Sequence, residues 1–215
     1  HEELVARMKN YELAYRMQTE VPEAVNIDGE TEKTKEMYGI GQDPTDEFGR
    51  RCLLARKMVE KGVRFVQLYH MGWDQHFTLP KQLSGQCYDA DQPTAALIKD
   101  LKMRGLLDDT LVVWGGEFGR TPMYQGGKGS AGRDHHIKGF SMWMAGGGMK
   151  PGMSYGETDE LGYSAIKDVV NVRDLHATML HQLGLHSNRF TYPFQGLDMK
   201  LTGVEPAKVI KGILG

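Results

Sequence analysis

Long hydrophobic runs, a cysteine framework and an excess of charge of one sign are all missing from this sequence of 215 residues. No stretch approaches the roughly 20 apolar residues of a membrane-spanning helix, so no membrane span is expected. The 26 Lys and Arg residues nearly balance 28 Asp and Glu residues, for a formal net charge of −2. That balance favours neither a nucleic-acid partner nor an anionic membrane surface.

Only two cysteines are present, Cys52 and Cys87, which excludes a disulfide-rich scaffold. Cys52 lies on the apolar face of a predicted helix, which favours a buried free thiol over a bridge. The composition, 40% hydrophobic and 25% charged, is that of a globular protein. We therefore expect a single α/β domain over residues 1–215.

The hydrophobic pattern alternates between helix and strand. Residues 20–44 are polar and turn-rich, which indicates a connecting arm. Short, unbroken apolar strands between helices predict a mostly parallel sheet with helices on both faces. Helices are predicted over 2–19, from a cap at Asp43 or Thr45 to Gly62, over 88–104, and from Asp174 to Leu183, and a last helical turn is predicted near 206–213. Strands are predicted over 63–69, 111–114 and 140–145.

Candidate metal ligands follow the first predicted strand. In sheets of this class, ligands bind beyond the carboxyl ends of the strands. Asp74 and His76 are two positions apart, so in an extended loop both side chains can reach one ion. The alternative is a surface turn around a structural Trp73.

Glu117 follows the strand at 111–114, next to Gly116 and two residues before Gly119. Packing explains a carboxylate poorly at such a position. Glu117 therefore becomes a candidate cation ligand or base, and the alternative is a salt bridge to Arg120.

A third loop carries the adjacent His135 and His136. Adjacent side chains on an extended backbone point to opposite sides, so only one of the two is expected to join a site. A donor set of Asp, Glu and His favours zinc or manganese over calcium, and the expected cofactor is one of these three divalent cations. Among the other histidines, His176 is a candidate for a supporting role.

Several runs in this chain resemble one family, and together they cover nearly the whole sequence. The runs are Gly-Trp-Asp-Gln-His at 72–76, the segment 100–113, Gly-Glu-Phe-Gly-Arg-Thr-Pro at 116–122, Gly-Arg-Asp-His at 132–135, Ala-Gly-Gly-Gly at 145–148 and Asp-Leu-His-Ala-Thr at 174–178. On these runs the chain is identified as a member of the family called domain of unknown function 1501.

That family is similar in turn to the alkaline phosphatase and sulfatase superfamily, which implies an alkaline phosphatase-like α/β fold with a two-metal hydrolytic centre. The resemblance assigns metal ligation to Asp74, His76, Glu117 and His135, with His135 favoured over His136. It also implies that this chain is the C-terminal part of a larger domain and that the nucleophile is not in this chain. The family resemblance further implies a periplasmic or secreted protein.

The implied function is that of a sulfatase-like metallohydrolase of sulfate or phosphate esters. Arg120 and Arg133 are the candidate clamp for anionic oxygens of a small-molecule or polysaccharide ester. One departure stands out: the Asp-His pair of the superfamily is Glu117-Phe118 here. Two alternatives stay open, a non-catalytic relative that binds a carbohydrate or a partner, and a phosphodiesterase or phosphomutase-like activity at the same site.

Overall fold

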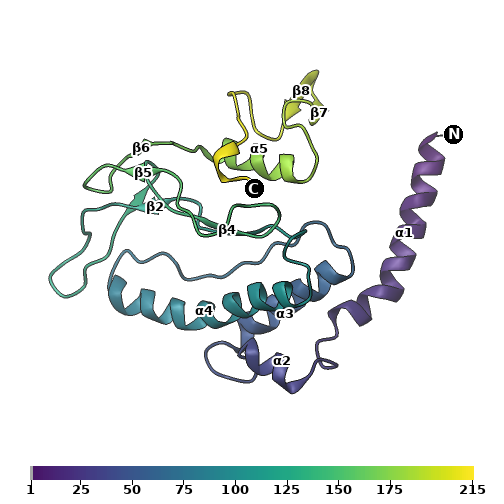
Figure 1. The fold of residues 1–215 in the computed structure, drawn as a ribbon, viewed down its shortest axis with the longest axis horizontal. Coiled ribbons are helices and arrows are strands. Elements are labelled where there is room, and N and C mark those ends of the chain that lie inside the picture. The colour runs from purple at the N-terminus through teal and green to yellow at the C-terminus, as the bar shows by residue number, and fades with distance from the viewer. Residues whose placement is uncertain (1) are drawn as a thin grey trace. The chain divides into compact units, whose positions relative to one another are not determined.

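The computed structural model describes residues 2–215, apart from the side chains at positions 19 and 20. The chain divides into two compact units, one up to Asp74 and over 80–106, the other over 75–79 and 107–215. The first unit is helical, and the second holds the strands (Figure 1). The helices of the first unit are α1 (Glu2–Val25), α2 (Glu32–Met37), α3 (Asp46–Glu60) and α4 (Leu79–Met103).

The core of the first unit is built from α3 and α4, which an ion pair of 2.9 Å between Arg56 and Asp100 connects. The apolar residues with the least exposure come from one face of each helix, as an amphipathic pattern requires. Burial raises the pKa of Cys52 to about 12, so this thiol stays protonated. The buried apolar side chains are Phe48, Cys52, Leu53 and Ala55 of α3 and Ala90, Pro93, Ala96, Leu97 and Leu101 of α4.

A charged residue occupies the middle of this helix pair. Arg56 of α3 is only 1% exposed, and its guanidinium lies 2.9 Å from Asp100, 2.6 Å from Glu60 and 2.7 Å from Glu30. Tyr38, which is completely buried, donates its hydroxyl hydrogen to the same Asp100 at 3.0 Å. Burial and the neighbouring carboxylate raise the pKa of Tyr38, so it remains a hydrogen-bond donor. Segment 20–44 thus contributes both α2 and a buried tyrosine to this unit.

The second unit contains short antiparallel strand pairs and the helix α5 (Val172–Gln182). Its C-terminal segment includes a 3₁₀ turn, η1 (Lys211–Ile213). The pairs are β1 (Val112–Trp114) with β4 (Trp143–Ala145), β2 (Gly119–Arg120) with β3 (His135–His136), β5 (Glu157–Thr158) with β6 (Ala165–Lys167), and β7 (Thr191–Phe194) with β8 (Leu197–Lys200).

The predicted mostly parallel, alkaline phosphatase-like sheet is therefore wrong for this structure. A parallel pair needs a long crossover, usually a helix, between its strands. No helix lies between β1 and β4, so the chain returns through loops and pairs antiparallel. The predicted strand at 63–69 has no regular secondary structure and enters none of the ladders among the described residues. The apolar pattern of residues 63–69 is typical of a strand. A strand also needs a neighbouring strand that pairs with it through backbone hydrogen bonds.

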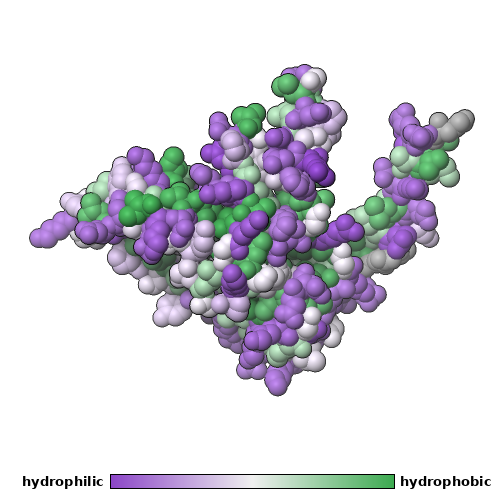
Figure 2. All heavy atoms as spheres, turned by 45° about the horizontal axis from the view of Figure 1, so that its top comes forward, coloured by the Kyte–Doolittle hydropathy of each residue, from purple (hydrophilic) through white to green (hydrophobic). Residues whose placement is uncertain are grey.

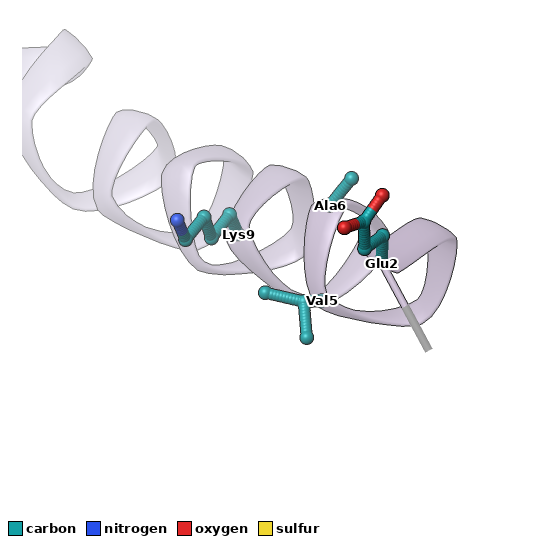
Figure 3. Close-up of a pocket in the computed structure, with 4 residues that line it drawn as sticks. All are labelled: Glu2, Val5, Ala6 and Lys9. Carbon is teal, nitrogen blue, oxygen red and sulfur yellow. The ribbon is translucent and has the colours of Figure 1, made fainter.

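Helix α1 is exposed along residues 2–18. Hydrophobic atoms are visible on its surface at the right of Figure 2. Glu2, Val5, Ala6 and Lys9 line a shallow hollow there (Figure 3), and all four belong to this single helix. Because no polar groups converge on it from other elements, the hollow is not a candidate active site. No helix in the described part of the chain is both long and apolar enough to cross a membrane.

Candidate metal centre

The loop before Asp74 is anchored within the first unit. The indole Nε1 of Trp73 donates a hydrogen bond to Nδ1 of His70 at 2.9 Å. The His70 ring lies edge-on to Phe48 of α3, with ring centroids 4.6 Å apart. Burial lowers the pKa of His70, which keeps Nδ1 available as an acceptor. Trp73 is thus a structural residue of this loop, one position before the candidate ligand.

Residues 75–79 run antiparallel to the loop that carries His135. Phe77 forms a bridge with Ala131, and the backbone nitrogen of Thr78 donates to the carbonyl of Ser130 at 3.0 Å. Farther along the same two segments, the nitrogen of Arg133 donates to the carbonyl of Gln75 at 3.1 Å. This pairing brings His76 to the 130–135 segment, although about 60 residues separate the two in sequence.

Gly132 makes that approach sterically feasible. A Cβ atom at this position would lie 2.1 Å from the carbonyl carbon of His76 and 2.4 Å from the nitrogen of Phe77. Contacts this short to backbone atoms do not occur, so a larger residue would separate the two segments. The glycine in the Gly-Arg-Asp-His run is therefore explained by close backbone packing.

Three of the predicted ligands come together. One ligand atom each from Asp74, His76 and His135 lies within 4.8 Å of the others. The two imidazole Nε2 atoms are 3.0 Å apart, and the ring centroids are 4.7 Å apart. Asp74 is joined to His76 through Gln75 alone, so the chain itself sets their spacing. His76 is half-buried, whereas the other two are exposed.

This donor set fits a divalent cation. Two nitrogens bound tetrahedrally at about 2.0–2.1 Å would lie about 3.3 Å apart, close to the spacing of the two Nε2 atoms. All separations between ligand atoms in the group are within 4.8 Å. One carboxylate and two imidazoles match zinc or manganese better than calcium, which prefers oxygen ligands throughout.

The remaining predicted residues have different environments. Glu117 is exposed between β1 and β2 and is not a member of the ligand group found among the described residues. Its neighbour Phe118 packs its ring 4.4 Å from that of His135. His136 is buried and bonds through Nε2 to the carbonyl of Tyr163. The two adjacent histidines thus face opposite sides of β3, and only His135 contributes to the group.

The β2–β3 pairing places Arg120 directly opposite His135. Directly opposite residues share one face of an antiparallel pair, with Cβ atoms about 5 Å apart. Arg120 also donates from Nη1 to the carbonyl of Arg133 at 3.2 Å. Nη1 of Arg133 donates a hydrogen bond to the carbonyl of Thr121 at 2.6 Å. Arg120 is therefore the better placed of the two predicted anion-binding residues.

Comparison with known proteins identifies the family of this chain and nothing more specific. The family described as protein of unknown function DUF1501 matches residues 1–214. The chain belongs to this family. No curated protein and no solved structure matches it. Membership agrees with the resemblance drawn from the sequence runs, and it assigns no chemistry.

The structure shows what two residues of the run at 174–178 do. Asp174 is buried in α5 and accepts hydrogen bonds from the backbone nitrogens of Asn171 and Lys208, at 3.1 and 2.9 Å. Thr178 is completely buried, and its hydroxyl accepts from the nitrogen of Ile210 at 2.9 Å. The two side chains therefore attach the C-terminal segment to α5. His176, on the same helix, is exposed and outside the ligand group.

Replacing Thr178 by valine is expected to lower the free energy of unfolding by about 1–3 kcal/mol, because the nitrogen of Ile210 would lose its acceptor in a buried position. Thr178→Ser, which keeps the hydroxyl, should cost clearly less. Urea unfolding followed by circular dichroism measures both. Equal losses for the two variants would show that the methyl group and not the hydrogen bond matters here.

The structure also points to a residue that sequence reasoning missed. Gln125 places its amide oxygen 2.8 Å from Nδ1 of His76. It belongs to no motif and is 49 positions away from that histidine in sequence. No sequence signal could have revealed it, because its relevance depends on a tertiary contact.

Proposed function

We propose that this chain carries the metal-binding part of a hydrolase that acts on sulfate or phosphate esters. The observation that carries the proposal is the group formed by Asp74, His76 and His135, with ligand atoms within 4.8 Å of one another. Arg120 supports the ester class, since it lies on the same face as His135 and supplies a guanidinium for anionic oxygens. The resemblance of the family to the sulfatase superfamily also supports this choice.

The residues of the chain have distinct parts in this proposal. Asp74, His76 and His135 hold a divalent cation, which when bound supplies Lewis acidity towards an ester oxygen. Arg120 would bind a non-bridging oxygen of the ester through its guanidinium. Phe118 covers one side of His135 and limits the rotation of its ring.

Metal and anion binding by the 215-residue chain test the proposal directly. Titration calorimetry with zinc is expected to give one equivalent bound, with manganese weaker and calcium weakest. The zinc-loaded chain should then bind inorganic sulfate or phosphate. Arg120→Met should weaken that anion binding by about tenfold or more, because a charge-assisted hydrogen bond is lost. Arg50→Met, on the surface of α3, is the matched control and should leave it unchanged.

Activity is tested on the natural protein that carries this sequence. The substrates are aryl sulfates, phosphate monoesters and phosphate diesters, each assayed with zinc and with manganese. These assays distinguish a sulfatase-like activity from a phosphodiesterase activity. Anion binding that does not depend on the metal would contradict the proposal. A chain that binds no divalent cation would contradict it outright.

A further inference from the structure

We infer that Gln125 is a positioning residue that holds His76 in the tautomer whose Nε2 is free of hydrogen and available to a metal. The inference rests on the proposed metal centre and adds to it the residue that prepares one of its ligands. Gln125 does not belong to the ligand group itself. Its influence acts through the imidazole ring of His76.

The hydrogen-bond chemistry determines the tautomer. Nδ1 of His76 lies 2.8 Å from Oε1 of Gln125. An amide oxygen can only accept a hydrogen bond, so Nδ1 must carry the hydrogen. A neutral imidazole has a single N–H, which leaves a lone pair on Nε2. Nε2 is the atom that faces His135, 3.0 Å from the Nε2 of that ring.

The backbone holds Gln125 in place for this contact. Gln125 and Gly132 exchange two backbone hydrogen bonds, each 2.7 Å long, and form an antiparallel bridge. Gly132 also lies against the backbone of His76, because it has no Cβ to keep the segments apart. Three segments therefore meet at Gly132, and the side chains of Gln125 and His76 come within hydrogen-bond distance.

Asp134 is the competing partner for the same nitrogen. Its Oδ1 is 3.8 Å from Nδ1 of His76, which is beyond hydrogen-bond distance. The same Oδ1 accepts from the backbone nitrogen of His135 at 2.8 Å. Gln125 is thus the nearer partner of Nδ1. Residues that orient a metal-bound histidine in this way typically change metal affinity 10- to 100-fold when they are replaced.

The test uses the 215-residue chain and two readouts. The first is the histidine tautomer in the metal-free protein, measured by ¹⁵N NMR of the imidazole nitrogens. The second is the zinc dissociation constant, measured by competition with a chelating dye. The unaltered chain should show His76 with its hydrogen on Nδ1.

Gln125→Leu removes the acceptor, so it should lose this tautomer preference and weaken zinc binding about 10- to 100-fold. Gln125→Glu keeps an oxygen acceptor, so it should retain the tautomer and bind zinc at least as tightly as the unaltered chain. Asp134→Asn is the control for the competing partner and should leave the tautomer of His76 unchanged. Backbone NMR shifts of each variant report whether its fold is kept.

The outcomes separate this inference from the function on which it rests. A chain that binds no zinc contradicts the proposed function. Zinc binding with unchanged affinity in Gln125→Leu, or a hydrogen on Nε2 of His76 in the metal-free chain, overturns the positioning role alone. A loss of affinity in Gln125→Leu that Gln125→Glu does not restore also overturns it, because the oxygen acceptor would then be irrelevant.

Discussion

Replacing His135 by alanine is expected to eliminate stoichiometric zinc binding, with affinity reduced by more than about 100-fold. That factor is the upper end of the effect expected for an outer-shell partner, and a lost ligand should exceed it. His135 supplies one of the two nitrogens in the group of three ligand atoms. Without it, only Asp74 and His76 remain, and a carboxylate with one imidazole holds a zinc ion weakly. Metal content after dialysis and calorimetric titration measure the change.

His176→Ala is the matched control. It removes another exposed histidine, from α5 and outside the ligand group, so zinc binding should stay at the level of the unaltered chain. Equal losses in both variants would indicate adventitious binding to surface histidines. Retained binding in His135→Ala would contradict the metal centre described here.

The second large effect is expected in the first unit, where Arg56→Met should lower the free energy of unfolding by about 3–5 kcal/mol. Arg56 is 1% exposed and forms ion pairs with Glu30, Glu60 and Asp100. Methionine fills a similar volume but leaves these carboxylates without their shared cation. Arg104, 2.8 Å from the other oxygen of Asp100, compensates only part of that charge.

Urea unfolding of the full chain measures this effect, and Arg50→Met is the comparison on the same helix. Arg50 pairs with Asp46 at the surface, with both side chains at least 40% exposed. Exposed pairs contribute about 0–1 kcal/mol, so this variant should remain near the stability of the unaltered chain. A similar, small loss in both variants would show that the buried network does not stabilise the α3–α4 pair.

The helices were predictable because helix periodicity is a local property. The predictions over 2–19 and 88–104 are confirmed within α1 and α4, and the helix from Asp174 corresponds to α5. α4 begins earlier than predicted, at Leu79, because the polar stretch before residue 88 concealed its first turns. The strands at 111–114 and 140–145 are confirmed in part, as the shorter β1 and β4.

The sheet was not predictable in the same way. An apolar run indicates that a segment forms a buried strand, but it does not identify the strand with which that segment pairs. β1 pairs with β4 across a long loop, and residues 63–69 pair with no strand among the described residues. The alternation of helices with apolar runs and the family resemblance both suggested a parallel sheet, and the strands of this chain pair antiparallel instead.

By itself, the sequence predicted the kinds of candidate ligand, their order along the chain and the loops that carry them. It also indicated that only one of His135 and His136 would join a site, since neighbouring side chains on a strand face opposite ways. Tertiary structure decided the rest. The tertiary structure places His135 in the ligand group and Glu117 outside it. It also places Gln125 within hydrogen-bond distance of His76. The physical reason is that ligand spacing depends on backbone pairing at Gly132, a contact between segments far apart in sequence.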